Sequence, residues 1–287
     1  HIGDHKTGST SIQLAFAKNL ITLDGHTLFY PAKLASNILA PQMQAYSKAI
    51  TPGARAAAAK PFEALAQRIR KAAADVTVIS AEELEGVSPK LLQKVLNAHF
   101  AEIVDEIRIV AYVRPHAARI VSSYAERIKI GIPRVLSSTL DEFGERRIVE
   151  KGFFYSPRFV ALRKQFGDQF ILRPMVRDQL HRGSVLDDFL HHAFKGLDYK
   201  ITDDSAANES LCLEDLMRLK VLHTVIKGGG LRHRVGWEFS RLSNQLPPVP
   251  THTKLQLHKA LADKIHQAYL QDARKMDKQF FEGAPVL

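Results

Sequence analysis

The sequence predicts an α/β fold with a central, mainly parallel sheet flanked by helices. Two observations predict it: short β-branched apolar runs alternate with amphipathic helical patterns, and the first residues lead through a glycine-rich turn into a helix. The 287 residues can bury a full core, and 45% hydrophobic with 24% charged residues is ordinary for a globular protein. We therefore expect residues 1–287 to form a single α/β domain.

Four apolar runs bounded by turn residues predict the strands. They are His26–Pro31, Val76–Ser80, Ile107–Val113 and Gln169–Arg173. The residues His1-Ile2-Gly3 resemble the end of one more strand, so we also expect a trimmed N-terminus.

Helical periodicity fills the segments between these runs. Apolar residues repeat at helical spacing after the first loop, from Ile12 to Leu20, and again in Ala54–Ala74, Pro89–Phe100 and Pro115–Ile128. The last two segments begin with proline, which is favoured at the first helical position. From about residue 205 to 287 the pattern is mostly helical, in Leu211–Ile226 and Lys254–Phe281, with Gly228–Gly230 and Pro247–Pro250 as interruptions. We expect this part to pack on the same core.

Charge and cysteine content narrow the classes of partner and compartment. The formal charge of +10 favours anionic partners, which could be a nucleotide, an acidic glycan, nucleic acid or an anionic membrane. No Lys/Arg block of nucleic-acid type occurs, and no apolar run approaches the roughly 18 residues that cross a membrane. The single cysteine, Cys212, excludes an intrachain disulfide and fits a reducing compartment. We therefore expect a cytoplasmic protein that binds no nucleic acid.

The opening residues "HIGDHKTGSTS" have the glycine spacing of a phosphate-binding loop, from Gly3 to Gly8. A nucleoside-triphosphate loop continues with Lys and then Ser or Thr, whereas here Ser and Thr follow and Lys6 lies inside the loop. Backbone N–H groups and the helix dipole still predict an anion site. Because no strand ends in the aspartate that holds Mg²⁺, we expect a short anionic group, with Lys6 beside it and no metal.

A second stretch carries an arginine and a hydroxyl that suit another phosphate. Arg114 follows the strand Ile107–Val113 at its carboxyl end, where α/β sheets bind ligands, and Ser122 comes eight residues later. Helical spacing predicts one polar face, opposite the apolar one, that holds Arg119, Ser122, Ser123 and Glu126.

Together the two stretches resemble the PAPS-dependent sulfotransferases, where PAPS is 3′-phosphoadenosine 5′-phosphosulfate. The family has K-[ST]-G-[ST]-[ST] after its first strand, and an Arg followed eight residues later by a Ser, near a Tyr; here Tyr124 is that tyrosine. "HIGDHKTGSTSIQ" is most similar to bacterial members that act on glycans or other surface molecules. The resemblance implies a three-layer, P-loop-like fold. It also implies that Arg114 and Ser122 hold the 3′-phosphate and that the 5′-phosphosulfate lies on Lys6, Thr7, Gly8, Ser9, Thr10 and Ser11.

The implied reaction moves a sulfuryl group from PAPS to a hydroxyl or amine acceptor, with adenosine 3′,5′-bisphosphate as the product. Lys6 would stabilise the leaving phosphate oxygen. A second group must accept the proton of the acceptor, and the candidates are His5, Glu82, Glu83 and His116. The acceptor itself is open between a glycan, another surface molecule and a small molecule.

This sequence departs from the family at several points. His5 stands where many relatives have Pro or Arg, and the Arg-Lys-Gly stretch of the cytosolic branch is missing. Gly228–Arg234 is glycine-rich and basic, which fits a mobile lid, an exposed loop or a join across missing residues. Two other functions stay open: a Mg²⁺-dependent P-loop nucleotide kinase, and a nucleotide-binding protein without turnover.

Overall fold

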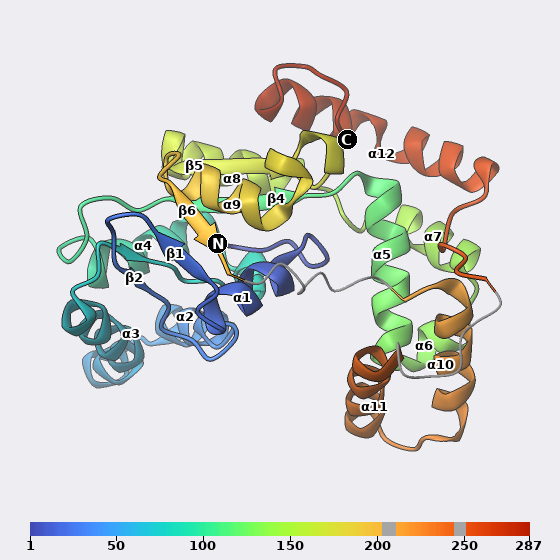
Figure 1. Cartoon of the computed structure of the whole chain (residues 1–287), viewed down its shortest axis with the longest axis horizontal. Helices are drawn as coiled ribbons and strands as arrows, with labels where there is room; N and C mark the ends of the chain where they lie inside the picture. The colour runs from blue at the N-terminus through green and yellow to red at the C-terminus, as the bar shows by residue number, and fades with distance from the viewer. Residues whose placement is uncertain (203–210, 244–250) are drawn as a thin grey trace. The chain divides into compact units, whose positions relative to one another are not determined.

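The structure, a computed structural model, describes residues 1–202, 211–243 and 251–287 (Figure 1). The predicted link Pro247–Pro250 lies outside the described residues. The chain divides into two compact units, His1–Arg114 with Ser156–Asn208 and Pro115–Tyr155 with Glu209–Leu287. The expected single domain stays a prediction.

The first unit is α/β, with short strands that pair mostly in parallel. β2 pairs with β3 and β4 pairs with β5, both in parallel, whereas β1 and β6 are antiparallel. The strands are β1 (Ile21–Leu23), β2 (Leu28–Phe29), β3 (Val76–Thr77), β4 (Ile109–Val113), β5 (Phe170–Pro174) and β6 (Tyr199–Ile201). Three of the predicted runs thus contain β2, β3 and β4, and the fourth contains β5 except for its last residue, Pro174. The β1–β6 pair was not predicted, because three residues are too few to show an alternating pattern.

The first residues of the chain join the two parallel pairs through backbone hydrogen bonds. Ile2 donates its N–H to the carbonyl oxygen of Val110, in β4, at 3.0 Å. On the other side, Ala81 donates to the carbonyl oxygen of His1 at 3.1 Å, and Ala81 lies beyond the end of β3. His1–Gly3 therefore run between the β3 and β4 segments, and the chain leaves the sheet directly into the glycine loop.

Helices cover both faces of the central strands in the first unit. All five side chains of β4 are buried, as in a strand covered on both sides. Val110 and Tyr112 pack with α1 and α9, while Phe159 of α8 stacks on Phe170, the register partner of Ile109, on the other face. The helices are α1 (Ser9–Ala17), α2 (Leu39–Lys48), α3 (Pro52–Ala72), α4 (Pro89–His99), α8 (Ser156–Phe166) and α9 (Val185–Ala193).

The second unit is helical in its described residues, with α5 at its centre. Ile120 and Ile128 of α5 pack with side chains from α7, α10 and α12, among them Phe143. The helices are α5 (His116–Lys129), α6 (Pro133–Leu136), α7 (Leu140–Val149), α10 (Leu213–Val225), α11 (Gly229–Leu242) and α12 (Lys259–Phe280).

Local sequence explains where several helices begin. Pro89 is the first helical residue of α4, as predicted, but Pro115 is the N-cap of α5 and not its first residue. Thr139 and Glu142 form a capping box at the start of α7, a signal that the periodicity alone did not reveal. Gly228 has φ 93° and caps α11, so residues 229–234, expected as a lid or loop, are instead helical.

Candidate anion-binding loop

Both loop glycines lie where a side chain would not fit. A Cβ on Gly3 would come within 2.9 Å of the Glu82 Cα atom, and a Cβ on Gly8 within 2.9 Å of a Val185 methyl group. Gly8 also has φ 87° and is the N-cap of α1. Lys6, inside the loop, has φ 68°, which non-glycine residues rarely adopt. The glycine spacing therefore shapes a tight turn that ends at a helix N-terminus.

The hydroxyl groups that the sequence predicts as ligands differ in their surroundings. Thr7 is fully buried and donates its hydroxyl to the carbonyl oxygen of Asp4 at 2.5 Å, so it braces the loop. Ser9 is buried at the first helical position, where its hydroxyl interacts with the Glu82 carboxylate and lowers the pKa of that group. Thr10 and Ser11 are half-buried, and the Ser11 N–H already bonds the Gly8 carbonyl oxygen at 3.0 Å. Thr7 therefore holds the shape of the loop, while Ser9 connects the start of α1 with the acidic residues that follow β3.

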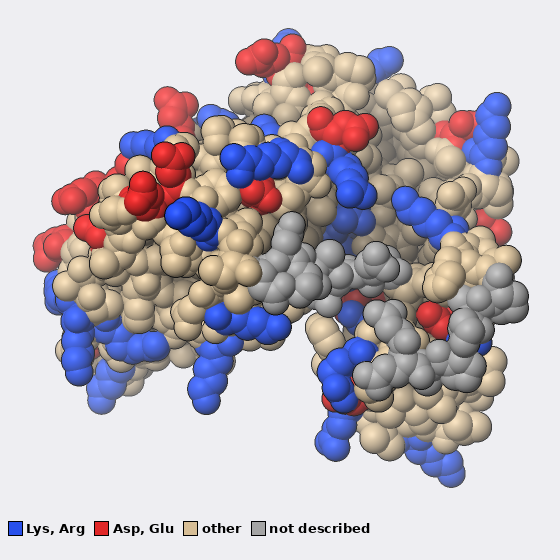
Figure 2. Space-filling view, viewed as in Figure 1, with Lys and Arg blue, Asp and Glu red and all other residues tan. Residues whose placement is uncertain are grey.

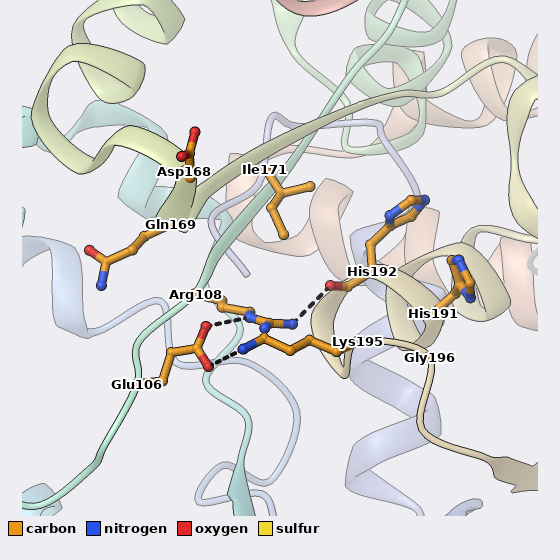
Figure 3. A pocket seen from close by; sticks show the side chains of 9 residues that line it. All are labelled: Glu106, Arg108, Asp168, Gln169, Ile171, His191, His192, Lys195 and Gly196. Atoms are coloured by element: carbon orange, nitrogen blue, oxygen red, sulfur yellow. Dashed lines mark hydrogen bonds and ion pairs between the residues drawn. The ribbon is translucent and has the colours of Figure 1, made fainter.

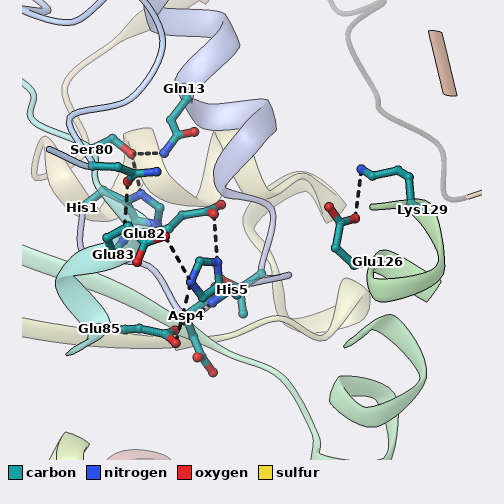
Figure 4. Close-up of polar contacts among 12 residues, drawn as sticks. His1, Asp4, His5, Gln13, Ser80, Glu82, Glu83, Glu85, Glu126 and Lys129 are labelled. Atoms are coloured by element: carbon teal, nitrogen blue, oxygen red, sulfur yellow. Dashed lines mark hydrogen bonds and ion pairs between the residues drawn. The ribbon is translucent and has the colours of Figure 1, made fainter. Parts of the chain in front are cut away.

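His5 lies among the acidic residues of the short 3-10 helix η1 (Glu82–Gly86), as Figure 4 shows. Its Nδ1 is 3.1 Å from Glu82 Oε2, and its backbone N–H donates to Glu85 Oε2 at 3.0 Å. Its Nε2 lies 3.9 Å from a Glu83 oxygen and 3.8 Å from Glu85 Oε1. The structure therefore brings together three predicted proton acceptors, His5, Glu82 and Glu83.

His5 and Glu82 form a hydrogen-bonded pair in which both side chains favour their charged forms. The hydrogen bond to Glu82 raises the pKa of His5, helped by the charges of the three glutamates and opposed by burial. Burial alone would raise the pKa of Glu82, but the hydrogen bond and charge of His5, the Ser9 hydroxyl and the Lys6 charge together outweigh burial, so the pKa of Glu82 is lowered. At neutral pH this pair holds a proton on the imidazole more readily than a free histidine does.

Glu85 is a site residue that the sequence analysis missed. Arg158, on α8, lies 3.6 Å from Glu85 Oε2 and 3.3 Å from Asp4 Oδ1. Burial, together with the hydrogen bond and charge of the adjacent Asp4, raises the pKa of Glu85 to about 7 against the charges of Arg158 and His5. The acidic run "EELEG" after a strand was visible in the sequence, but nothing there connects it with Arg158.

The second predicted phosphate site divides between the two units. Arg114 follows β4 in the first unit, and Ser122 lies half-buried on α5 in the second. Their joint role stays a prediction. The prediction of a polar face on α5 opposite its apolar face is wrong. Arg119 and Ser123 are buried, and the Arg119 guanidinium lies over the Phe153 ring at 5.0 Å. Neighbouring helices surround α5, so its polar side chains are enclosed as well.

His116 is a buried structural residue of the second unit. Its Nε2 lies 3.0 Å from Asp272 Oδ2, and its ring packs between Tyr155 and Tyr269, with both centroid distances 4.6 Å. The same Asp272 oxygen accepts the backbone N–H of Tyr155 at 2.8 Å. A base must reach its substrate, so His116 is a poor candidate for proton transfer.

A hollow of about 540 Å³ lies at the amino ends of β4 and β5, away from the loop (Figure 3). Glu106 pairs with both cations there, with Arg108 at 2.9 Å and Lys195 at 2.7 Å. Arg108 also donates to the carbonyl oxygen of Ala193, at the end of α9. Because both cations already pair with the Glu106 carboxylate, the hollow does not favour an added anion.

Comparison with protein-family models, with curated proteins and with solved structures finds no match. The resemblance to the PAPS-dependent sulfotransferases therefore rests on the two sequence motifs and stays a prediction. Every helix within residues 1–202, 211–243 and 251–287 is too short or too polar to span a lipid bilayer.

Proposed function

We propose that this chain is a PAPS-dependent sulfotransferase that transfers a sulfuryl group to a hydroxyl or amine acceptor, with a glycan or another surface or small molecule as the acceptor class. The observation that carries the proposal is the glycine loop at the N-terminus of α1, with Lys6 inside it and the His5–Glu82 pair at its edge. The hydrogen bonds of His1–Gly3 with both parallel pairs support a P-loop-like sheet with three layers.

The loop residues fit a phosphosulfate. The Ser9 hydroxyl is buried at the first position of α1, and the tight turn at Gly8 leaves the first backbone N–H groups of α1 without a side-chain cap. Such a helix N-terminus favours an anion. When bound, PAPS supplies the sulfuryl group and a phosphate leaving group. Lys6 then adds the positive charge, while Arg114 and Ser122 remain the predicted ligands of the 3′-phosphate.

The His5–Glu82 pair is the proposed proton acceptor for the acceptor hydroxyl or amine. Glu82 accepts a hydrogen bond from Nδ1, which leaves Nε2 of a neutral His5 to take a proton. The glutamate stabilises the imidazolium that forms. Because Glu82 raises the pKa of His5, the neutral base becomes available only as the pH rises through that raised value.

The two alternative functions differ from a sulfotransferase in their ligand or in their turnover. A nucleotide kinase needs a lysine directly after the second glycine and Mg²⁺, but Ser9 occupies that position. A binding protein without turnover would hold the same nucleotide and would tolerate loss of the His5–Glu82 pair.

Isothermal titration with adenosine 3′,5′-bisphosphate, with and without Mg²⁺, tests the proposal, with ADP as the matched control. We expect binding that is independent of Mg²⁺ and tighter than that of ADP. Mg²⁺-dependent binding with a preference for ADP would favour the kinase. Release of the bisphosphate from PAPS, measured in the same preparation, distinguishes an enzyme from a binding protein.

A further inference from the structure

The helical hairpin formed by α10 and α11 exposes an apolar stripe. One face of α10 is buried, with Leu216 and Leu219 in the core of the second unit. On the other side, side chains four residues apart point to solvent: Met217, Val221 and Val225. Val221 is 68% exposed and Val225 is 76% exposed, so the stripe is not a partly covered edge of the core.

Apolar exposure continues across the turn into α11. Leu231, in the first turn of α11, is 49% exposed, and Trp237 further along is 43% exposed. The two helices are joined by the three residues 226–228, so Val225 and Leu231 flank the tip of the hairpin. Val225 and Leu231 thus place exposed apolar side chains on both sides of one turn, and clustered apolar exposure marks a binding surface more often than scattered exposure does.

Positive charge surrounds this tip. No Asp or Glu occurs from Leu216 to Trp237, a stretch that holds Arg218, Lys220, Lys227, Arg232 and Arg234. Three of these already bond within the protein, to Asp215 Oδ1 and to the carbonyl oxygens of Ser138 and Ile226. Lys227 and Arg234 are exposed, and Lys and Arg side chains project from this end of the hairpin in Figure 2.

The base of the hairpin is fixed by close backbone packing. A Cβ on Gly236 would lie 1.7 Å from the Lys129 carbonyl oxygen, so only glycine allows α11 to approach α5 this closely. A Cβ on Gly131, which has φ 74°, would lie 2.5 Å from the Arg232 Cβ atom. The hairpin is therefore held firmly at α5 while its tip reaches solvent.

We infer that the tip of this hairpin binds the surface of an anionic lipid bilayer. Val221, Val225 and Leu231 would enter the interfacial layer, and Lys227 and Arg234 would lie among the headgroups. Aliphatic side chains gain from contact with acyl chains, whereas a polysaccharide or a nucleic-acid backbone offers them little. The exposed cations Lys227 and Arg234, in a stretch without Asp or Glu, favour anionic lipids over zwitterionic ones.

Vesicle co-sedimentation tests this inference, with phosphatidylcholine vesicles that contain or lack phosphatidylglycerol. Trp237 is the only tryptophan in the chain and lies on α11, with Lys129 Nζ 4.2 Å from its ring centroid, so its emission reports on the hairpin as a whole. We expect binding to the anionic vesicles, a blue shift of the emission, and loss of both as salt rises. The double variant Val221→Asp with Val225→Asp should lower partitioning at least tenfold.

The control variant is Ile50→Asp, at an apolar residue that is 87% exposed in the first unit. It should bind vesicles as the unaltered protein does, and thermal melting should show that all variants fold. Equal binding by the double variant, equal binding to both kinds of vesicle, or no binding to either would overturn the inference. So would binding of a soluble polyanion with no vesicle binding, or a dimer, seen by light scattering, that the double variant abolishes.

Discussion

The two units each contain a histidine paired with a carboxylate, and the two pairs differ in what surrounds them. His5 and Glu82 lie 3.1 Å apart at the loop, where the histidine side chain is 39% exposed. His116 and Asp272 lie 3.0 Å apart in the second unit, where the histidine is only 3% exposed between two tyrosine rings. Nearly equal distances therefore occur in very different surroundings.

This difference shows that pairing alone does not make a proton acceptor. The open pair can reach a substrate, and its imidazole can exchange protons with solvent. The closed pair contributes hydrogen bonds and ring packing to a core, and its carboxylate also holds the Tyr155 backbone. We therefore expect changes at the loop to affect turnover and changes at His116 to affect stability.

The largest effect on turnover should come from Lys6, which lies in the loop beside the open pair. Lys6→Ala should lower the rate of bisphosphate release from PAPS about 10²–10³-fold, because it removes a charge that the transition state needs more than the ground state does. The Kd of adenosine 3′,5′-bisphosphate should rise far less, since backbone groups still hold the anion. Lys6→Arg should rescue poorly, because a planar guanidinium does not replace a point charge. Normal turnover by Lys6→Ala would contradict the proposed mechanism.

Removing the open pair's histidine should have the next largest effect. His5→Gln should lower turnover about 10²-fold, the usual contribution of a general base. Glu82→Gln removes the main cause of the raised pKa of His5, so the rising limb of the pH–rate profile should move to lower pH. An unmoved limb in Glu82→Gln would show that another group accepts the proton.

The closed pair should give the opposite result. His116→Phe keeps a ring between Tyr155 and Tyr269 but leaves the buried Asp272 carboxylate with fewer hydrogen bonds. We expect a loss of about 2–4 kcal/mol in the free energy of unfolding, measured in urea. The rate per folded molecule, measured below the unfolding transition, should not change. A slow but fully stable variant would abolish the distinction between the two pairs.

The sequence predicted the loop better than its surroundings. Glycine spacing and strand–loop–helix order are local, so Gly3, Gly8 and Lys6 could be located from the chain alone. The different burial of His5 and His116 could not be predicted, since burial depends on packing between segments that are far apart in the sequence. The same is true of Arg158, which lies beside Asp4 and Glu85, and of Arg119, whose position on α5 looked polar.

Arg114 tests whether the first unit recognises a second phosphate at all. Arg114→Ala should weaken binding of adenosine 3′,5′-bisphosphate at least tenfold, because a charge-assisted contact is worth about 1.5–3 kcal/mol. Binding of adenosine 5′-phosphate should barely change. Ser122→Ala should show the same selectivity with a smaller effect. If Arg114→Ala weakens both ligands equally, the arginine is structural and the 3′-phosphate assignment fails.

The smallest expected effect concerns Glu85, which accepts a hydrogen bond from the backbone N–H of His5. Its pKa is about 7 in the folded protein, compared with 4.5 for a free glutamate, so between these values the folded state binds more protons than the unfolded state. Its contribution to stability is therefore complete below about pH 4.5 and is lost as the pH rises through 7. The raised pKa of His5 acts in the same direction, with stability present below 6.5 and lost above it.

Glu85→Gln removes the first of these two contributions. We expect the unfolding free energy, measured in urea from pH 5 to pH 8, to fall less steeply than in the unaltered protein. The difference at pH 8 should be on the order of 1–2 kcal/mol, reduced by the partial exposure of this side chain. Glu83→Gln is the matched control, because the Glu83 side chain is 56% exposed in the same helical turn. Parallel curves for Glu85→Gln and the unaltered protein would show that Glu85 stays ionised throughout, and Arg158 would then be its decisive partner.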